Sequence, residues 1–228
     1  MANKKKNKNP IATLLVAIGV IALLGALGWY VHNLIEDLNA EKASRQITER
    51  LIAVIDEKKT DKPTSTEDAD DSEDVVDDYV EPTVDPELLE METNVVDEVS
   101  YIGIVEIPSS SLSLPVAYDW DYDKLAISPC RYAGSYYTND LVICAHDYGS
   151  HFRAIRSLGI GDSVLFTTID GETIRYIVAN VETVQPTAIS DMIENSGNSE
   201  SRNTWDLTLF TCNIGGMTRC AVRCQRVN

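Results

Sequence analysis

An uncharged apolar segment near the N-terminus constrains this chain most. Ile11 to Val31 is 21 residues long, carries no charged side chain and is rich in Leu, Ile, Val, Ala and Gly. A helix of that length spans about 31 Å, which matches the hydrocarbon core of a bilayer. The apolar core of a cleaved signal peptide is shorter, about 7–15 residues, and no small-x-small cleavage site stands out before Trp29. The sequence therefore predicts an uncleaved transmembrane signal anchor over residues 10–31.

The residues that flank this segment indicate its orientation. Four lysines lie within residues 1–9, and Trp29 and Tyr30 lie at the far end, where aromatic side chains gather at a membrane interface. Because a basic flank stays in the cytoplasm, residues 1–9 are predicted to form a cytoplasmic tail. We expect a single-pass protein of the cell membrane, with everything after residue 31 outside the cell.

The net charge of −17 is concentrated in one block. Residues 67–98 hold 15 acidic side chains and no basic one, whereas residues 1–66 hold 10 basic and 7 acidic, and residues 99–228 hold 9 basic and 14 acidic. This balance excludes a nucleic-acid binder that works through an overall basic surface. Residues 60–98 are interpreted as a disordered acidic tether, because like charges repel and the block has little apolar surface to bury.

Residues 32–59, between the anchor and the tether, have the pattern of an amphipathic helix. Glu and Arg separate the apolar side chains, and Pro and Gly are absent; the apolar positions are Ile35, Leu38, Ile47, Leu51, Val54 and Ile55. Three clean heptads are not visible, which argues against a coiled coil with a second copy. We predict a juxtamembrane helix that serves as a solvated stalk.

The remaining residues, 99–228, have the pattern of a small β domain. Short apolar or alternating runs bounded by turn residues predict strands at 101–107, 112–118, 140–145, 163–168, 173–184, 207–211 and 221–227. Asp170-Gly171 is a hairpin signal between two of them. Helical stretches are expected at about 121–127, 151–157 and 188–195. The predicted fold class is mainly β, a closed or nearly closed barrel preceded by one transmembrane helix.

All five cysteines lie in this domain. Outside the cell paired cysteines form disulfides, and an odd count leaves at least one thiol over. Cys212 is the candidate nucleophile, because it ends a strand beside a Gly-rich stretch, and Arg219 follows where the chain turns back. His146 ends another apolar run in the same way. The other four fit buried positions, and a disulfide between two of them stays open: Cys130, Cys144, Cys220 and Cys224.

A zinc site is the metal alternative for this cluster of side chains. The available ligands are Cys144, His146, His151, Cys220 and Cys224, but the close C-x-x-C pair of structural zinc sites is absent. The same absence argues against a surface thiol oxidoreductase. We therefore predict no metal and no cofactor.

These residues resemble the sortases, the membrane-anchored cysteine transpeptidases of Gram-positive bacteria. The motif Thr208-Leu-Phe-Thr-Cys212 carries the resemblance, with Arg219 at the start of the last strand and Ala145-His146 at the end of an earlier one. The stretches 102–108, 114–116 and 223–227 add to it, as does His151-Phe152. The resemblance implies a sortase catalytic domain over residues 99–228, folded as a closed β-barrel of about eight strands with short helices.

The resemblance also implies a reaction. Cys212 would be the nucleophile, His146 the general acid and Arg219 the donor to the oxyanion. The enzyme would cleave an LPxTG-like sorting signal of a surface protein through a thioester and transfer that protein to an amine of the cell wall. A family region that lines the substrate groove corresponds to residues 182–206. The candidate substrate contacts are Thr211, Pro186, Met192, Trp205 and His151.

Some features depart from the family pattern. Ala145 stands where sortases often have Gly, and Asp147 is left out of the catalytic set because adjacent strand residues point to opposite faces. Asp85-Pro86 is followed by Glu87, not by the aromatic residue of the lid in some pilin-building sortases. Transfer to a cell-wall precursor is thus favoured over a pilin amine, and calcium stimulation is not predicted. The other alternative is a catalytically silent, sortase-like module that binds peptides at the cell surface.

Overall fold

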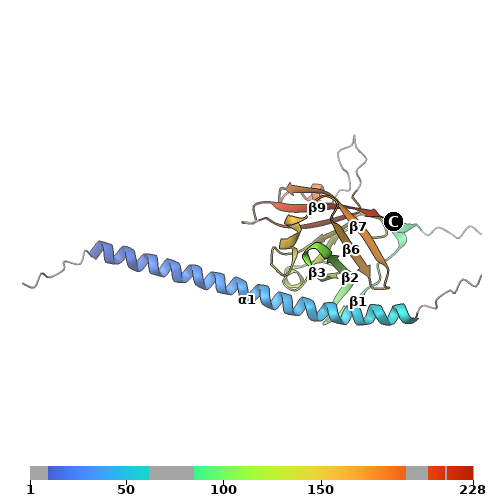
Figure 1. The fold of residues 1–228 in the computed structure, drawn as a ribbon, viewed down its shortest axis with the longest axis horizontal. Coiled ribbons are helices and arrows are strands. Elements are labelled where there is room, and N and C mark those ends of the chain that lie inside the picture. The colour runs from blue at the N-terminus through green and yellow to red at the C-terminus, as the bar shows by residue number, and fades with distance from the viewer. Residues whose placement is uncertain (1–9, 62–84, 194–204, 214, 228) are drawn as a thin grey trace, which may run out of the picture. The chain divides into compact units, whose positions relative to one another are not determined.

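The computed structural model describes residues 10–61, 85–193, 205–213 and 215–227 (Figure 1). The chain divides into two compact units, residues 1–39 and residues 40–228. Helix α1 (Pro10–Asp61) contributes to both. Within the described residues, α1 is the one helix long and apolar enough to cross a membrane, and its apolar side chains before residue 39 are exposed. The predicted cytoplasmic tail, residues 1–9, lies outside the described residues.

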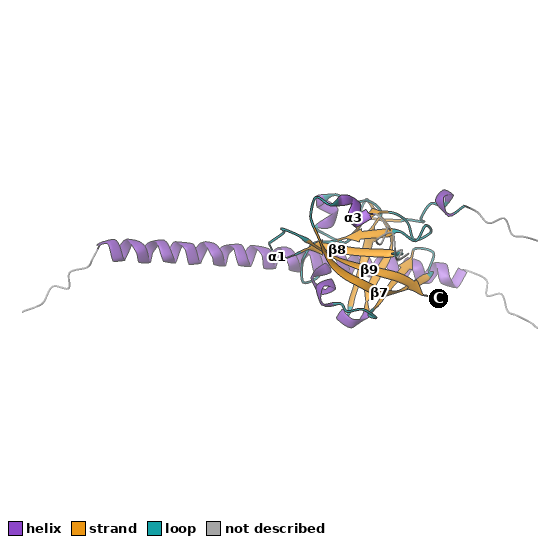
Figure 2. Ribbon diagram, turned by 90° about the horizontal axis from the view of Figure 1, so that it is seen from above, coloured by secondary structure: helices purple, strands orange, loops and turns teal. Residues whose placement is uncertain are grey.

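The second unit is built on a sheet that closes on itself. Its described strands are β1 (Asn94–Val96), β2 (Val99–Ile107), β3 (Leu112–Ala117), β4 (Cys130–Ala133), β5 (Leu141–Cys144), β6 (Ser163–Thr168), β7 (Thr173–Val184), β8 (Leu207–Cys212) and β9 (Arg219–Val227). Their order is β1-β2-β3-β4-β5-β8-β9-β7-β6, and β6 pairs back onto β2. Eight strands thus form a closed barrel (Figures 1 and 2), and β1 extends the sheet beyond it. The predicted mainly β fold is confirmed.

Glycine at position 103 lets the barrel close. Gly103 lies opposite Thr168 in the antiparallel pairing of β2 with β6. A Cβ atom at this position would lie 2.3 Å from the backbone oxygen of Thr167, closer than van der Waals contact allows. A side chain here would push the two strands apart, which explains why this largely apolar strand contains a glycine.

All seven strands expected from the sequence are present, and two more were missed. β6 and β7 show the alternation that predicted them, with Phe166 and Tyr176 fully buried in the barrel interior. β4 is only four residues long, and its register shifts between Arg131 and Ala133 as it pairs with β5, so it shows no clear period. The short helices are α2 (Tyr122–Leu125), α3 (Ile189–Ile193) and the 3-10 turns η1 (Pro86–Leu88), η2 (Pro108–Ser110) and η3 (Phe152–Ser157).

The second half of α1 is not the solvated stalk that its pattern led us to predict. Its apolar stripe is buried: Ala40, Ile47, Leu51 and Ile55 are at most 5% exposed. Ile47, Leu51 and Ile55 belong to a core cluster that also contains Val96, Tyr101 and Ile104 of β1 and β2. Arg50 reinforces the contact with an ion pair to Asp97 at 2.9 Å, and Lys58 pairs with Glu92. The prediction of an amphipathic helix is correct, but the outer face of the barrel covers its apolar side.

Removing the side chain of Leu51 is expected to destabilise this unit. Leu51 is 0% exposed, whereas its neighbour Ile52 on the same helix is 44% exposed. We expect Leu51→Ala to lower the free energy of unfolding by about 2–5 kcal/mol, because a buried Leu→Ala change leaves a cavity. This corresponds to a Tm lower by at least about 4 °C, measured by thermal unfolding of the detergent-solubilised chain. Ile52→Ala is the matched control, and equal shifts for both variants would contradict the docked helix.

Part of the acidic segment that was predicted to be a tether is folded. Residues 62–84 of the predicted tether lie outside the described residues, but residues 85–98 are folded. Asp85 caps η1 by accepting a hydrogen bond from the backbone N–H of Glu87 at 3.1 Å, and β1 pairs with β2. Met91 joins the barrel core and Val96 the outer cluster. These two side chains stabilise a segment whose composition alone indicated disorder.

Candidate active site

The three residues predicted to carry out the chemistry lie at the ends of neighbouring strands. β5 and β8 run parallel, and beyond their last pair the backbone N–H of Ala145 donates to Phe210 O at 3.2 Å. The Thr211 hydroxyl donates to Ala145 O at 2.8 Å, so the two strand ends are tied together. His146 and Cys212 directly follow these tied residues. Cys212 in turn lies opposite Arg219 in the antiparallel pairing of β8 with β9.

His146, Cys212 and Arg219 all line one open pocket of about 210 Å³. The half-buried thiol of Cys212 is part of this lining. Among the described residues that line the pocket, Arg219 is the one permanently charged side chain, and no carboxylate is present. The remaining lining residues are largely apolar or aromatic: Trp120, Tyr122, Leu125, Tyr132, Cys144, Ala145, Pro186, Met192, Phe210 and Thr211.

The turn between β8 and β9 holds Arg219. One terminal amino group of its guanidinium donates to Gly216 O at 3.0 Å and to Thr218 O at 3.3 Å. Asn213 closes the turn by donating its backbone N–H to Thr218 O at 2.9 Å and its amide to the Thr218 hydroxyl at 2.8 Å. Because a guanidinium has five N–H donors in a planar fork, the turn can orient it and leave further donors for a ligand.

His146 and His151 have different surroundings. The His146 ring stacks on Tyr148 with a centroid distance of 4.8 Å and lies in the pocket lining. His151 is fully buried, and its Nε2 lies 3.2 Å from the backbone oxygen of Ile127. Asp147 forms an ion pair with Arg156 at 2.9 Å, and neither it nor His151 belongs to the pocket lining.

Of the candidate substrate contacts, the structure brings Thr211, Pro186 and Met192 to this pocket. Trp205 lines a separate hollow with Ile160 and Arg226. It is separated from the start of β8 by Asp206 alone, at the opposite end of that strand from Cys212. The segment between β7 and β8 therefore begins beside the pocket and ends away from it. For this reason the predicted groove region, residues 182–206, contains residues that line the pocket and one, Trp205, that does not.

A sortase family model matches residues 105–227, more than half of the chain. The chain belongs to the sortase family. Solved structures similar to this sortase include sortase C1 of Streptococcus suis, 25% identical with a TM-score of 0.46, covering 56% of this chain and 73% of that one. Sortase C1 of Streptococcus agalactiae is 25% identical with a TM-score of 0.49, covering 59% and 71%. Sortase C of Streptococcus pneumoniae is 24% identical with a TM-score of 0.48, covering 59% and 71%.

A search among curated proteins finds no match for this sortase. Membership of the family makes the chain a sortase-type transpeptidase, as its motifs predicted. One helix among its described residues is suited to anchoring it in a membrane.

Sequence reasoning missed an aromatic wall of the pocket, formed by Trp120, Tyr122 and Tyr132. Trp120 stacks on Tyr132 with ring centroids 5.6 Å apart, and Tyr132 meets Phe210 edge-to-face at 5.2 Å. Tyr122 packs edge-to-face on Trp120 at 6.0 Å. Trp120 and Tyr122 are 42% and 77% exposed. The sequence signal that could have revealed this wall is the presence of two large aromatic side chains between acidic residues in a polar connection.

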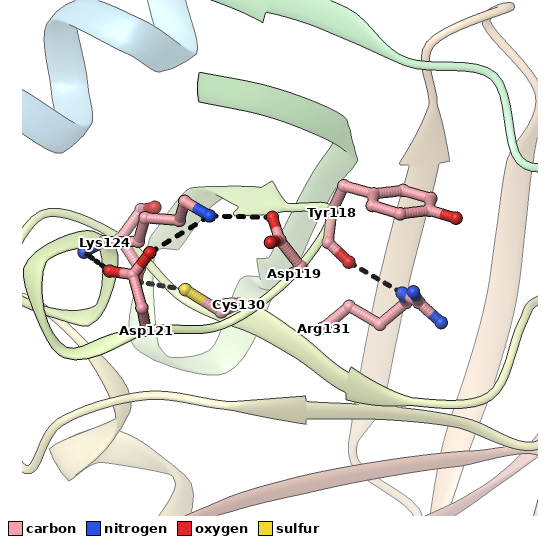
Figure 3. A network of polar contacts seen from close by, with 7 residues as sticks. Tyr118, Asp119, Asp121, Lys124, Cys130 and Arg131 are labelled. Carbon is pink, nitrogen blue, oxygen red and sulfur yellow. Dashed lines mark hydrogen bonds and ion pairs between the residues drawn. The ribbon is translucent and has the colours of Figure 1, made fainter. Parts of the chain in front are cut away.

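A polar network fixes the connection that carries this wall (Figure 3). The Asp121 carboxylate caps α2 by accepting from the backbone N–H of Lys124 at 2.8 Å. The Lys124 ammonium bridges Asp119 at 2.8 Å and Asp121 at 3.1 Å (Figure 3). The hydrogen bond to Asp119 raises the pKa of Lys124. Arg131 donates to Tyr118 O at 2.7 Å and lies over the Tyr118 ring. The wall is therefore held in place before any ligand arrives.

The five cysteines of this sortase are free thiols, and they differ in exposure. Cys130, Cys144, Cys220 and Cys224 are buried, whereas Cys212 is half-buried at the pocket. Burial raises the pKa of Cys130 and Cys220, and it raises the pKa of Cys144 and of Cys224 to about 12. Among the described residues, no group of three His, Cys, Asp or Glu side chains is arranged to hold a metal ion.

Alkylation of the native protein is expected to be selective for Cys212. At pH 8, thiols with a raised pKa stay protonated, and the thiolate is the form that reacts with iodoacetamide. We expect one equivalent of label at Cys212 in the native protein and five after denaturation, measured by peptide mass spectrometry. Equal labelling of Cys144 in the native protein would contradict the burial of that thiol.

Proposed function

We propose that this sortase cleaves an LPxTG-like sorting signal and joins the new acyl end to an amine of the cell wall. The observation that supports this most is the position of Cys212, His146 and Arg219 at three neighbouring strand ends around one pocket. His146 and Cys212 are far apart in the sequence, and the parallel pairing of β5 with β8 brings them to one edge of the barrel. The antiparallel pairing of β8 with β9 places Arg219 opposite Cys212 at the same edge. The proposal names surface proteins with a C-terminal sorting signal as the substrates.

The first half-reaction forms a thioester. The Cys212 thiolate attacks the carbonyl carbon of the scissile amide, and an S–C bond forms as negative charge develops on the carbonyl oxygen. Arg219 donates hydrogen bonds to this oxyanion; it does not act as a base, because a guanidinium has N–H donors and no acceptor. The C–N bond then breaks, and His146 donates its proton to the leaving amine.

The second half-reaction transfers the acyl group. An amine of the acceptor attacks the thioester carbonyl carbon, a new C–N bond forms, and the S–C bond breaks to release Cys212 as a thiolate. His146 takes up the proton that the incoming amine loses, so the enzyme returns to its starting state. The aromatic wall covers part of the pocket, and limiting the access of water there favours transfer to the amine over hydrolysis.

The position in the cell follows from α1. We infer that residues 10–31 anchor the enzyme in the cell membrane, with the lysines of residues 1–9 on the cytoplasmic side and the barrel outside. The proposed reaction requires no metal or cofactor, since Arg219 supplies the positive charge at the oxyanion. An outward-facing barrel would meet both exported surface proteins and cell-wall precursors.

The test is a ligation assay on the whole chain in detergent. The whole chain is used because residues 47–55 pack against the barrel, so a fragment starting at residue 99 would lack part of its core. The protein is incubated with quenched LPxTG-like peptides and either triglycine or diaminopimelate, and the products are identified by mass spectrometry. We expect a ligated peptide and a thioester adduct on Cys212. Peptide binding without turnover or adduct would overturn the proposal in favour of a silent binding module.

A further inference from the structure

Arg223 is a buried cation that the proposed mechanism does not use. Its side chain is 3% exposed, on strand β9, which pairs with β7 and β8. Nε donates to the Glu182 carboxylate on β7 at 2.7 Å, and one amino group donates to the Thr208 hydroxyl on β8 at 3.0 Å. The same amino group donates to Met192 O at 3.3 Å, and the other donates to Asp191 O. One guanidinium therefore joins two neighbouring strands to α3.

Burying this charge is costly, so its partners indicate its role. A buried cation destabilises the folded state unless it is paired and its donors are used. Glu182 supplies the opposite charge, but its side chain is 39% exposed, and the Met192 and Asp191 contacts are to backbone carbonyls of α3. The last carbonyls of a helix lack intrahelical partners, and a cation beside them complements the helix dipole.

α3 depends on such support because it is short. It has five residues, and helices of that length are not stable by themselves. Its one buried side chain, Met192, is 3% exposed and lines the pocket beside Pro186, which lies between β7 and α3. Two interactions thus set the position of Met192 in the pocket lining: the packing of its side chain, and the hydrogen bonds from the Arg223 guanidinium to the backbone of α3.

We propose that Arg223 is a positioning residue that fixes α3, and through Met192 the part of the pocket where the sorting-signal peptide binds. This inference rests on the proposed function. Arg223 is not part of the pocket lining, so it acts through α3 and not on the reacting atoms. Its loss is expected to weaken peptide binding while the rate of the bound complex is largely retained.

The experiment compares KM with kcat in the whole enzyme. Arg223→Lys keeps the charge but loses the fork that reaches four partners at once. We expect KM for the peptide to rise at least about tenfold. The kcat value, calculated per enzyme molecule whose Cys212 can be alkylated, should stay within about threefold of wild type. Arg226→Lys is the matched control on the same strand, where the arginine is 36% exposed and pairs with Glu172; its KM and kcat should match wild type.

Further variants separate positioning from stability. Thr208→Val removes one partner of Arg223 with little change of shape, and a KM rise of about threefold is expected even if Arg223→Lys fails to fold. Met192→Ala should raise KM as well, and the Arg223→Lys/Met192→Ala double variant should be no worse than the poorer single variant, because both act on one element. Multiplicative effects, or an unchanged KM in Arg223→Lys and Thr208→Val, would overturn the inference. A wild-type enzyme without turnover would instead overturn the proposed function on which it rests.

Discussion

Cys212→Ala is expected to abolish ligation and peptide cleavage, with kcat lower by about 10³-fold or more. Removing a nucleophile eliminates the covalent pathway and leaves the residual rate that binding and electrostatics supply. Cys144 also lines the pocket, but burial raises the pKa of its thiol to about 12, so it stays protonated at neutral pH and cannot replace Cys212. The measurement is the rate of product formation by wild type and variant, with mass spectrometry of the intact protein.

Cys144→Ala is the matched control for this result. It removes a thiol from the same pocket and leaves the proposed machinery intact, so its kcat is expected to stay within about tenfold of wild type. Ligation that survives Cys212→Ala would exclude the thioester mechanism. Loss of ligation in Cys144→Ala with its fold intact would assign a chemical role to a thiol that the mechanism treats as structural.

Arg219→Lys is expected to lower kcat/KM by about 10²–10³-fold, the usual effect of losing one oxyanion donor. Lysine keeps the positive charge, but its ammonium is a point charge and lacks the planar fork that the β8–β9 turn orients through Gly216 and Thr218. Because this substitution leaves Cys212 and His146 in place, the pH dependence of the remaining activity should follow that of wild type.

The assay for Arg219 is steady-state ligation over a range of pH. Arg226→Lys, on the same strand but outside the pocket, serves as the control for loss of an arginine fork elsewhere on β9. An activity of Arg219→Lys within threefold of wild type would show that charge alone suffices at this position. It would then remove the requirement for a guanidinium fork from the mechanism.

The barrel was predictable because its signals are local. β6 and the first half of β7 alternate between buried and more accessible side chains, and a turn at Asp170-Gly171 joins them, so a short window of sequence contains the whole pattern. The candidate chemical residues were also proposed from local sequence, since Cys212 ends an apolar run and Arg219 begins the next. The two missed strands lack this property: β1 lies in the acidic block, and β4 contains an irregularity.

Tertiary structure alone decided what covers each apolar face. The spacing of Ile47, Leu51 and Ile55 established that α1 has an apolar side, but periodicity carries no information about the partner, and the outer face of β1 and β2 supplied it. The sequence likewise did not determine where Trp205, His151 and the aromatic wall lie. For Trp205 the reason is that the connection between β7 and β8 begins beside the pocket and ends at the opposite end of β8. Arg223 looks like any strand arginine in sequence, and only the fold brings its guanidinium to α3. Sequence thus determined the mainly β class, and it predicted the membrane anchor and the candidate reactive residues, all of which depend on composition and near neighbours. The packing of distant segments determined the walls of the pocket and what holds them.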